Sequence, residues 1–275
     1  MRPKQWIKNG FVLAPLIFTG QFTDSASIYA ALLAASLFCL ASSATYIVND
    51  YRDIEQDRKH PVKAKERPLA SGQVSKTEAL ALLLLLYGIL LWAYTVQPAV
   101  ILVILSYLVL NIAYTFALKH QPVIDIFTIA FGFVLRVYAG AVALSVPLSS
   151  WMFVTSLCLA LFLAAVKRKQ ELSHRGSDGR KVLAQYTVVL VDRYAAMSAT
   201  GALMFYSLYV MSAYPEELVF TIPLVLFGLF RYWFIVETLD GGESPTTTLL
   251  KDWQLLLTIL VWVLCCIWAL WPEVN

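Results

Sequence analysis

Long apolar runs alternate with short polar segments along almost the whole chain. A helix that crosses a bilayer needs roughly 20 apolar residues, and strands with open edges cannot span lipid, so each run predicts a membrane helix. Pro15 interrupts the first run, which is short, and predicts a tilted or broken segment there. The nine predicted spans cover residues 9–22, 26–48, 77–96, 99–118, 122–145, 149–170, 187–212, 216–238 and 252–271.

Among the connections between these runs, only alternate ones carry lysine or arginine. The N-terminal tail and the longer connections at 49–76, 167–186 and 239–251 contain them. The intervening connections contain neither residue and cover 23–25, 97–98, 146–148 and 213–215. Because cytoplasmic connections of membrane proteins are enriched in Lys and Arg, this pattern predicts a cytoplasmic N-terminus and a C-terminus on the other side. We expect the functional residues where the long cytoplasmic connections meet helix ends.

Composition supports a membrane protein and excludes several other classes. Hydrophobic residues make up 59% of the chain and charged residues 14%, and the mean hydropathy is +0.68. Soluble domains carry about 25% charged residues, so a disordered chain, a nucleic-acid binder and an ordinary soluble enzyme are all excluded. No repeat or low-complexity linker divides the sequence, which predicts a single domain over residues 1–275. The fold class expected is therefore all-α, with nine transmembrane helices in one multi-pass domain.

The segment that follows the second run carries the densest group of acidic residues. Asp50, Asp53 and Asp57 are spaced i, i+3 and i+7, which places three carboxylates on one face of a helix continuing out of the membrane. With the amide oxygen of Asn49, these ligands suit a hard cation such as Mg²⁺, which also takes substrate phosphate oxygens. The alternative is a solvated helix end whose acids are neutralised by nearby basic residues, namely Arg52, Arg58 and Lys59.

A basic residue framed by turn formers follows ten residues later. Arg67 can contact phosphate through two parallel hydrogen bonds, and Pro68 and Gly72 predict a turn that would hold it in place. The alternative is an ordinary basic connection on the cytoplasmic side. Tyr46, one turn before Asp50, is a candidate to line the same cavity.

The fifth run contains a charge deep in the predicted membrane. Arg136 lies about fourteen residues into that run, where an ionised group costs roughly 2.5–3.5 kcal/mol, so it should face the protein interior. Asp125 is eleven residues earlier, close to three full turns, and shares the same face. Either Arg136 contacts a substrate phosphate or ribose, or it pairs with an acid on another helix. Lys119 lies near a cytoplasmic helix end, where it is a phosphate ligand or a snorkelling lysine.

These residues together resemble a known family. The pattern Asn49-Asp50-x-x-Asp53-x-x-x-Asp57, followed by Arg67-Pro68-Leu69-x-x-Gly72, is similar to the first signature of the UbiA superfamily of intramembrane prenyltransferases. The resemblance covers essentially the whole chain. It implies helices around a central cavity, with Asn49, Asp50, Asp53 and Asp57 holding Mg²⁺ on a diphosphate substrate at the cytoplasmic end.

The sequence departs from the common pattern of that superfamily at the end of the sixth run. Where a second Asp-rich motif is usual, Lys167, Arg168 and Lys169 precede a single acid, Glu171, and Lys167 and Glu171 can pair at i, i+4. This basic cluster suggests extra phosphate groups to neutralise, although it could also be an ordinary membrane-edge cluster. This replacement of acidic by basic residues resembles one branch of the superfamily. The N-terminal residues 2–9 and the motif at residues 132–140 resemble the same branch.

That branch implies transfer of the 5-phosphoribosyl group of phosphoribosyl pyrophosphate (PRPP) to a polyprenyl phosphate in the plasma membrane of a bacterium. The active site would face the cytoplasm, and the product would serve arabinose-containing cell-envelope glycans. We expect catalytic roles for Asp50, Asp53, Asp57 and Arg67. The residues expected to bind substrate are Tyr46, Asn49, Arg58, Lys119, Arg136, Lys167, Arg168 and Glu171.

Other functions stay open on the sequence alone. A conventional prenyltransferase would use a prenyl diphosphate and an aromatic or other acceptor, which the absent second Asp-rich motif disfavours. A transporter or lipid flippase would place charges along a path through the membrane. Here the polar residues gather instead at the cytoplasmic end. A structural scaffold would give the carboxylate face no purpose. The sequence predicts no nucleic-acid partner and leaves a homo-oligomer open.

Overall fold

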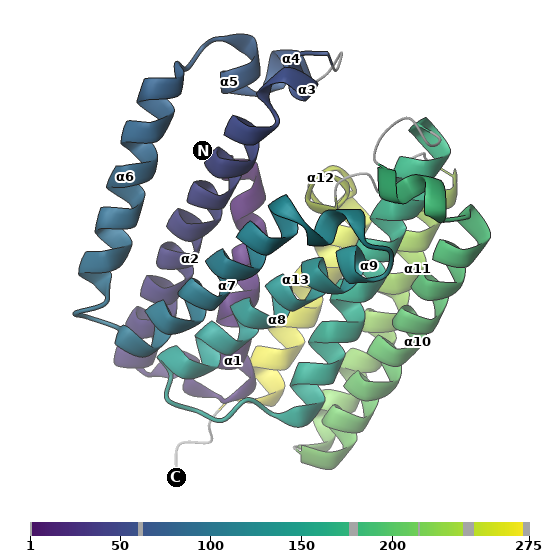
Figure 1. Ribbon diagram of the computed structural model, residues 1–275. Helices are drawn as coiled ribbons and strands as arrows, with labels where there is room; N and C mark the ends of the chain where they lie inside the picture. Colours follow the sequence, from purple (N-terminus) through teal and green to yellow (C-terminus); the bar gives the residue numbers. More distant parts are fainter. Residues whose placement is uncertain (1, 60–62, 176–180, 214, 239–244, 272–275) are drawn as a thin grey trace.

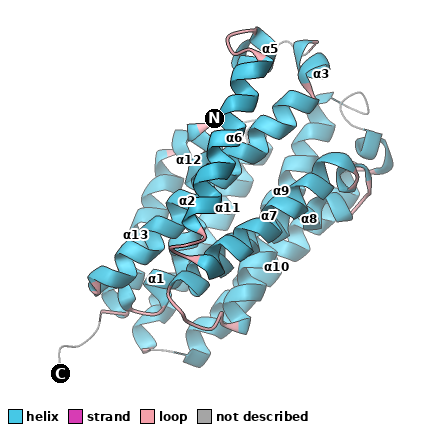
Figure 2. Cartoon of the chain, turned by 60° about the vertical axis from the view of Figure 1, so that its left-hand side comes forward, coloured by secondary structure: helices cyan, strands magenta, loops and turns pink. Residues whose placement is uncertain are grey.

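The computed structural model describes residues 2–59, 63–175, 181–213, 215–238 and 245–271. All regular structure in this part of the chain is helical, with no strand (Figure 2). The long helices are α2 (Ser25–Arg52), α6 (Lys76–Ala93), α7 (Pro98–Phe116), α8 (Ile124–Ala143), α9 (Ser150–Arg175), α10 (Val188–Ala213), α11 (Ile222–Thr238) and α13 (Trp253–Ala269). The shorter ones are η1 (Pro3–Leu13), α1 (Ala14–Phe18), η2 (Gln21–Thr23), α3 (Ile54–Arg58), α4 (Lys63–Glu66), α5 (Pro68–Ser71), η3 (Leu118–His120), η5 (Lys181–Gln185), η6 (Glu216–Thr221) and α12 (Pro245–Lys251).

Seven helical segments of the described chain are long and apolar enough to cross a membrane. They coincide with the second to eighth runs of the sequence. The last run forms α13, which has 17 residues and is shorter than the others. The first run differs most, because 3₁₀ helix η1 extends to Leu13 and only five residues follow in α1. Pro15 stands in the first turn of α1, and Gly20 adopts a left-handed φ of 67° just beyond it, so a long α-helix cannot form there.

Local capping explains where two of the long helices begin. The Asp24 carboxylate accepts hydrogen bonds from the backbone N–H groups of Ala26 and Ser27 at the start of α2. Ser75 and Glu78 form a reciprocal capping box at the start of α6. Both signals are readable in the sequence as a small polar residue that precedes an apolar run.

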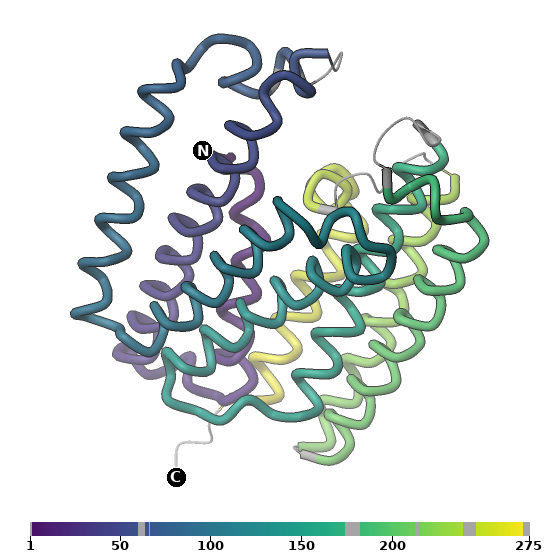
Figure 3. Tube along the Cα trace, in the orientation of Figure 1, coloured from purple at the N-terminus to yellow at the C-terminus, as the bar shows by residue number. Residues whose placement is uncertain are grey.

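The long helices stand side by side in one bundle, with α8 packed between α7 and α9, and α10 against α9 (Figures 1 and 3). The short helices α3, α4 and α5 follow α2 at the upper end in Figure 1, where α12 also lies. Residues 245–251 were expected as part of a connection, but they form α12, which contacts η1. The short helices that follow α2 and α11 therefore lie at the same end of the bundle.

Segment η1 is wedged between α2 and α8 and packs against both. A Cβ atom at Gly140 of α8 would lie 1.9 Å from the Val12 carbonyl oxygen, so only glycine permits this approach. Val12 is fully buried among Phe38 and Ile104 in an apolar cluster of α2 and α7. This contact fixes η1, and with it the N-terminal polar residues, inside the bundle.

Candidate functional site

The acidic segment begins in α2 and ends in α3. The predicted continuous helix is interrupted at Asp53, which terminates α2 and begins α3. The i to i−4 hydrogen bonds nevertheless continue, from the Asp53 N–H to the Asn49 carbonyl at 3.0 Å and from the Asp57 N–H to the Asp53 carbonyl at 2.8 Å. Asp50 and Asp57 are buried, whereas Asn49 and Asp53 are partly exposed. The predicted common face therefore survives the break between the two helices.

Arg67 contacts two of the three carboxylates. Its Nη1 atom donates to Asp57 Oδ2 and lies 3.3 Å from Asp50 Oδ1. Arg67 directly precedes α5, which Pro68 begins and which ends at Gly72 in a left-handed conformation (φ 79°). The turn predicted around Arg67 is thus present, and it carries the guanidinium back over the acidic segment.

Two further cations contact the acidic segment. Arg2 donates through Nη2 to Asp50 Oδ1, and its guanidinium carbon lies 4.9 Å from the centre of the Tyr46 ring. Lys119, in η3, places its Nζ atom 3.6 Å from Asp53 Oδ1. The role of Arg2 was not expected from the sequence, although it stands in the N-terminal motif at residues 2–9.

Arg58 is oriented differently from the other basic residues near this segment. It pairs with Glu55 at 3.5 Å, and the two side chains are 52% and 81% exposed. This i, i+3 pair lies in solvent beside the acidic segment rather than among its buried carboxylates.

The carboxylates of Asp50 and Asp57 share one cation of the chain itself. A single guanidinium nitrogen of Arg67 contacts both Asp50 and Asp57, so a positive charge already lies between these carboxylates. Among the described residues, no group of three or more His, Cys, Asp or Glu side chains gathers as a metal site.

Arg136 lies in the interior, as predicted from its depth in the fifth run. Its Nε donates to Asn9 Oδ1 at 2.8 Å, its Nη1 to the Gly132 carbonyl at 2.7 Å and its Nη2 to the Tyr107 hydroxyl at 3.1 Å. The guanidinium carbon is also 4.8–5.4 Å from the ring centres of Phe38, Tyr107 and Phe133. All three hydrogen-bond acceptors are neutral, so they do not offset the charge of Arg136.

The basic cluster at the end of α9 is held mostly by internal contacts. Arg168 is fully buried; its Nε donates to Asp125 Oδ2 at 2.6 Å, its Nη2 to the Tyr114 hydroxyl at 2.9 Å, and its Nη1 to Glu171. The predicted pair between Lys167 and Glu171 is present at 3.9 Å. The expected inward stripe of α8 is confirmed as well, since Asp125 and Arg136 are both buried.

Tyr186 completes the network around Asp125. Its hydroxyl donates to Asp125 Oδ1 at 2.7 Å and accepts a hydrogen bond from the Val123 N–H at 2.5 Å. Burial raises the pKa of Tyr186, which keeps the hydroxyl protonated and able to donate. Val123 has a φ of 67°, which is unusual for a β-branched residue and stores strain where the chain enters α8.

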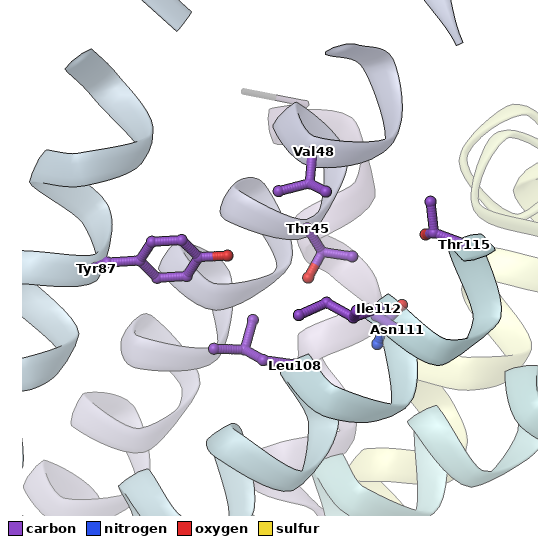
Figure 4. Close-up of a pocket in the computed structure, with 7 residues that line it drawn as sticks. All are labelled: Thr45, Val48, Tyr87, Leu108, Asn111, Ile112 and Thr115. Carbon is purple, nitrogen blue, oxygen red and sulfur yellow. The ribbon is translucent and has the colours of Figure 1, made fainter. Parts of the chain in front are cut away.

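A small cavity opens between α2, α6 and α7, below the acidic segment (Figure 4). Tyr87 of α6 points across it toward Thr45 of α2, and α7 closes the opposite wall. Its lining is mixed, with three aliphatic side chains and four that carry a hydroxyl or amide group. The lining residues are Thr45, Val48, Tyr87, Leu108, Asn111, Ile112 and Thr115.

Comparison with known proteins agrees with the sequence motifs. The model of the UbiA prenyltransferase family matches residues 11–247. Decaprenyl-phosphate phosphoribosyltransferase of Corynebacterium glutamicum is 36% identical, over 98% of this chain and 85% of that protein. The protein of the same name from Mycolicibacterium smegmatis is 35% identical, over 96% of this chain and 88% of its own length.

A solved structure has the same fold at much lower identity. The UbiA homologue from Archaeoglobus fulgidus, bound to GPP and Mg²⁺, superposes with a TM-score of 0.74 over 98% of this chain and 97% of its own. At 17% sequence identity this likeness establishes the fold alone.

Proposed function

This chain belongs to the UbiA prenyltransferase family, and on that premise we propose that it transfers the 5-phosphoribosyl group of PRPP to a polyprenyl phosphate. The products are pyrophosphate and a polyprenylphosphoryl ribose 5-phosphate, a precursor for arabinose-containing cell-envelope glycans. The observation that carries the proposal is the similarity, over nearly the full length, to decaprenyl-phosphate phosphoribosyltransferases of two bacteria.

The acidic segment is the proposed site for the pyrophosphate of PRPP. Asp50, Asp53 and Asp57, with the side-chain oxygen of Asn49, would hold Mg²⁺, which neutralises the charge on the leaving pyrophosphate when bound. In support, a nitrogen of Arg67 already contacts Asp50 and Asp57. The Arg67 guanidinium would also donate hydrogen bonds to a phosphate oxygen of the substrate.

The reaction breaks the bond between the ribose anomeric carbon and the pyrophosphate oxygen. A new bond forms between that carbon and a phosphate oxygen of the lipid. Attack from the opposite face of the ribose turns α-linked PRPP into a β-linked product. A phosphate monoester has its second pKa at about 6 and is ionised near neutral pH, so the chain need not supply a strong general base. Its contribution is to position both substrates and to stabilise the charge on the leaving group through Arg67.

The polyprenyl tail needs an apolar path beside the phosphate-binding residues. The apolar residues Val48, Leu108 and Ile112 lie near the end of α2 that carries the acidic segment (Figure 4), and the tail would pass along this surface, because the cavity beside them is only about the size of one water molecule. The seven long apolar helical segments support a multi-pass membrane protein. We further propose a single domain, nine membrane crossings and a site that faces the cytoplasm of a bacterial plasma membrane, from the distribution of Lys and Arg.

A prenyltransferase that moves a prenyl group to an aromatic or other acceptor is the second candidate, because the family model covers such enzymes in general terms. The contacts of Arg168 with Asp125 and Glu171 disfavour it, because they occupy the place where a second metal-binding acidic motif would be needed.

A donor comparison separates the two functions. The purified full-length chain in detergent with Mg²⁺ would receive either labelled PRPP and a polyprenyl phosphate, or labelled prenyl diphosphate and an aromatic acid. The proposal predicts lipid-soluble label in the first mixture. Label in the second mixture alone would overturn it.

A further inference from the structure

We propose that Lys8 and Arg136 form a phosphate-monoester subsite distinct from the acidic segment. This inference rests on the proposed function and deepens it, because PRPP and the lipid together bring two phosphate monoesters besides the pyrophosphate. One is the 5-phosphate of the ribose, and the other is the phosphate of the polyprenyl acceptor. Both offer the same chemistry to a pair of cations.

Packing of η1 against α8 holds the two residues together. Asn9, which follows Lys8 directly, accepts the hydrogen bond from Arg136 Nε at 2.8 Å and is itself buried. Asn9 also donates to the Ser42 hydroxyl of α2 at 3.2 Å, so its side chain is anchored on both neighbouring helices. The close contact of Gly140 with the Val12 carbonyl keeps η1 at this position. Lys8 is therefore held beside a buried guanidinium.

The charges in this region are not balanced by the protein. Within the described part of the chain, Lys8 has no ion pair, and the three hydrogen bonds of Arg136 end on neutral acceptors. The fully buried Arg168 contrasts with them, since it pairs with Asp125 and Glu171. Arg136 is buried and Lys8 beside it is half-buried, and such uncompensated cations are costly, so an anion from outside the chain would complete the arrangement.

The electrostatic environment of Lys8 also favours a bound anion. Burial, followed by the charges of Arg136 and Arg2, lowers the pKa of Lys8 to about 8. Lys8 and Arg136 also have hydrogen-bond donors suited to phosphate oxygens. A bound dianion would relieve the repulsion and favour the charged ammonium.

The subsite is displaced from the acidic segment along η1. Arg2, at the start of this segment, contacts Asp50, whereas Lys8 is six residues further. At the 3₁₀ rise of about 2 Å per residue, the two backbone positions lie roughly 12 Å apart. A phosphate at Lys8 is then a different group from the pyrophosphate held at Asp50.

Binding measurements without turnover test the subsite. The full-length chain would be titrated with ribose 5-phosphate, with a short-chain polyprenyl monophosphate and with pyrophosphate plus Mg²⁺. The variants are Lys8→Gln and Lys8→Met, with Lys4→Gln as the matched control, because Lys4 lies on the same segment and is exposed. A charge-assisted hydrogen bond is worth enough for a loss of affinity of about 10- to 100-fold.

Each outcome decides the proposal. A loss for ribose 5-phosphate alone supports the subsite and assigns it to the 5-phosphate; a loss for the lipid monophosphate alone supports it and assigns it to the acceptor. Binding of pyrophosphate with Mg²⁺ should change less than about twofold, as all affinities should in Lys4→Gln. Unchanged affinity for both monoesters in a Lys8 variant would overturn the proposal.

Stability provides an independent criterion. Since Lys8 is an uncompensated charge, Lys8→Met should be at least as stable as the wild type in the absence of ligand, and a variant that unfolds would contradict the inference. The experiment can also refute the proposed reaction while it supports the subsite. If the wild type transfers no phosphoribosyl group but still binds a phosphate monoester through Lys8, the subsite stands while the reaction does not.

Discussion

The Nε atom of Arg168 lies 2.6 Å from Asp125 Oδ2, and neither side chain is exposed. This pair joins α9 to α8, and Tyr186 and Glu171 extend it toward the cytoplasmic connections predicted from the sequence. Because Asp125 offsets the charge of Arg168, this guanidinium can be fully buried at the end of α9. The common pattern of the superfamily has a second acidic motif at that place.

Removing the carboxylate from this pair should destabilise the protein. Asp125→Asn leaves the buried charge of Arg168 under-compensated, and breaking such a pair costs about 3–5 kcal/mol. We expect a clearly lower Tm in detergent. Arg58→Gln is the control, because its exposed pair with Glu55 contributes little. A normal Tm for Asp125→Asn, together with lost activity, would instead assign Arg168 to substrate binding.

The approach of η1 to α8 should not tolerate a larger residue. Gly140→Ala would place a Cβ atom 1.9 Å from the Val12 carbonyl oxygen, so backbone must move. Because η1 carries Arg2, Lys8 and Asn9, we expect a lower Tm and a loss of transfer of about tenfold or more.

Gly88→Ala is the matched control for this substitution. Gly88 lies inside α6 with open space around its Cβ position, so alanine should leave activity unchanged and favour the helix by about 1 kcal/mol. Wild-type Tm and activity in Gly140→Ala would show that η1 is not fixed by this contact.

The sequence predicts the local features of this fold well. Apolar runs locate the membrane helices because hydropathy depends only on nearby residues, and the Lys167–Glu171 pair follows from helical spacing. The inward position of Arg136 follows from the cost of charge in lipid. The sequence also predicts the turn around Arg67, because Pro68 and Gly72 have characteristic backbone preferences.

The contacts that complete the site could not be predicted in this way. Arg2 and Asp50 are 48 residues apart, and Arg168 and Asp125 are 43 apart, so their pairing depends on how helices pack. The 3₁₀ conformation of η1 is similarly a product of its wedged position between α2 and α8. Lys8 stands in the N-terminal motif at residues 2–9, but its position beside Arg136 also depends on how η1 packs against α8.

Arg67 should stabilise the acidic segment most when metal is absent. In Arg67→Gln, Asp50 and Asp57 lose a shared cation although their side chains are only 10% and 4% exposed. We expect the Tm in a chelator to fall by roughly 5–10 °C. Mg²⁺ should then raise the Tm of the variant more than that of the wild type, because it replaces the missing charge. Equal Tm values in chelator, or no response to Mg²⁺ in either protein, would contradict this assignment.

Phosphate-monoester binding should weaken at alkaline pH. The pKa of Lys8 is lowered to about 8 in the unliganded protein, so its ammonium is charged below that pH and neutral above it. The phosphate stays a dianion across this range. The dissociation constant should therefore rise as pH increases beyond about 8.

Titration calorimetry between pH 7 and pH 9.5 checks this expectation with the monoester that binds at Lys8. Lys8→Gln should bind weakly with no such pH dependence, while Lys4→Gln should follow the wild type. The same rise in Lys8→Gln would assign the pH dependence to another group.

The most direct test combines the proposed reaction with the acidic segment. Wild-type protein, Asp53→Asn and Glu55→Gln would be incubated with Mg²⁺, radiolabelled PRPP and a polyprenyl phosphate, and label would be measured in the organic phase. Glu55 is the control because its side chain is 81% exposed in the same helical segment. We predict lipid-borne label with wild type and Glu55→Gln, and a rate lower by about 100-fold or more with Asp53→Asn. Transfer by Asp53→Asn at the wild-type rate would contradict the account.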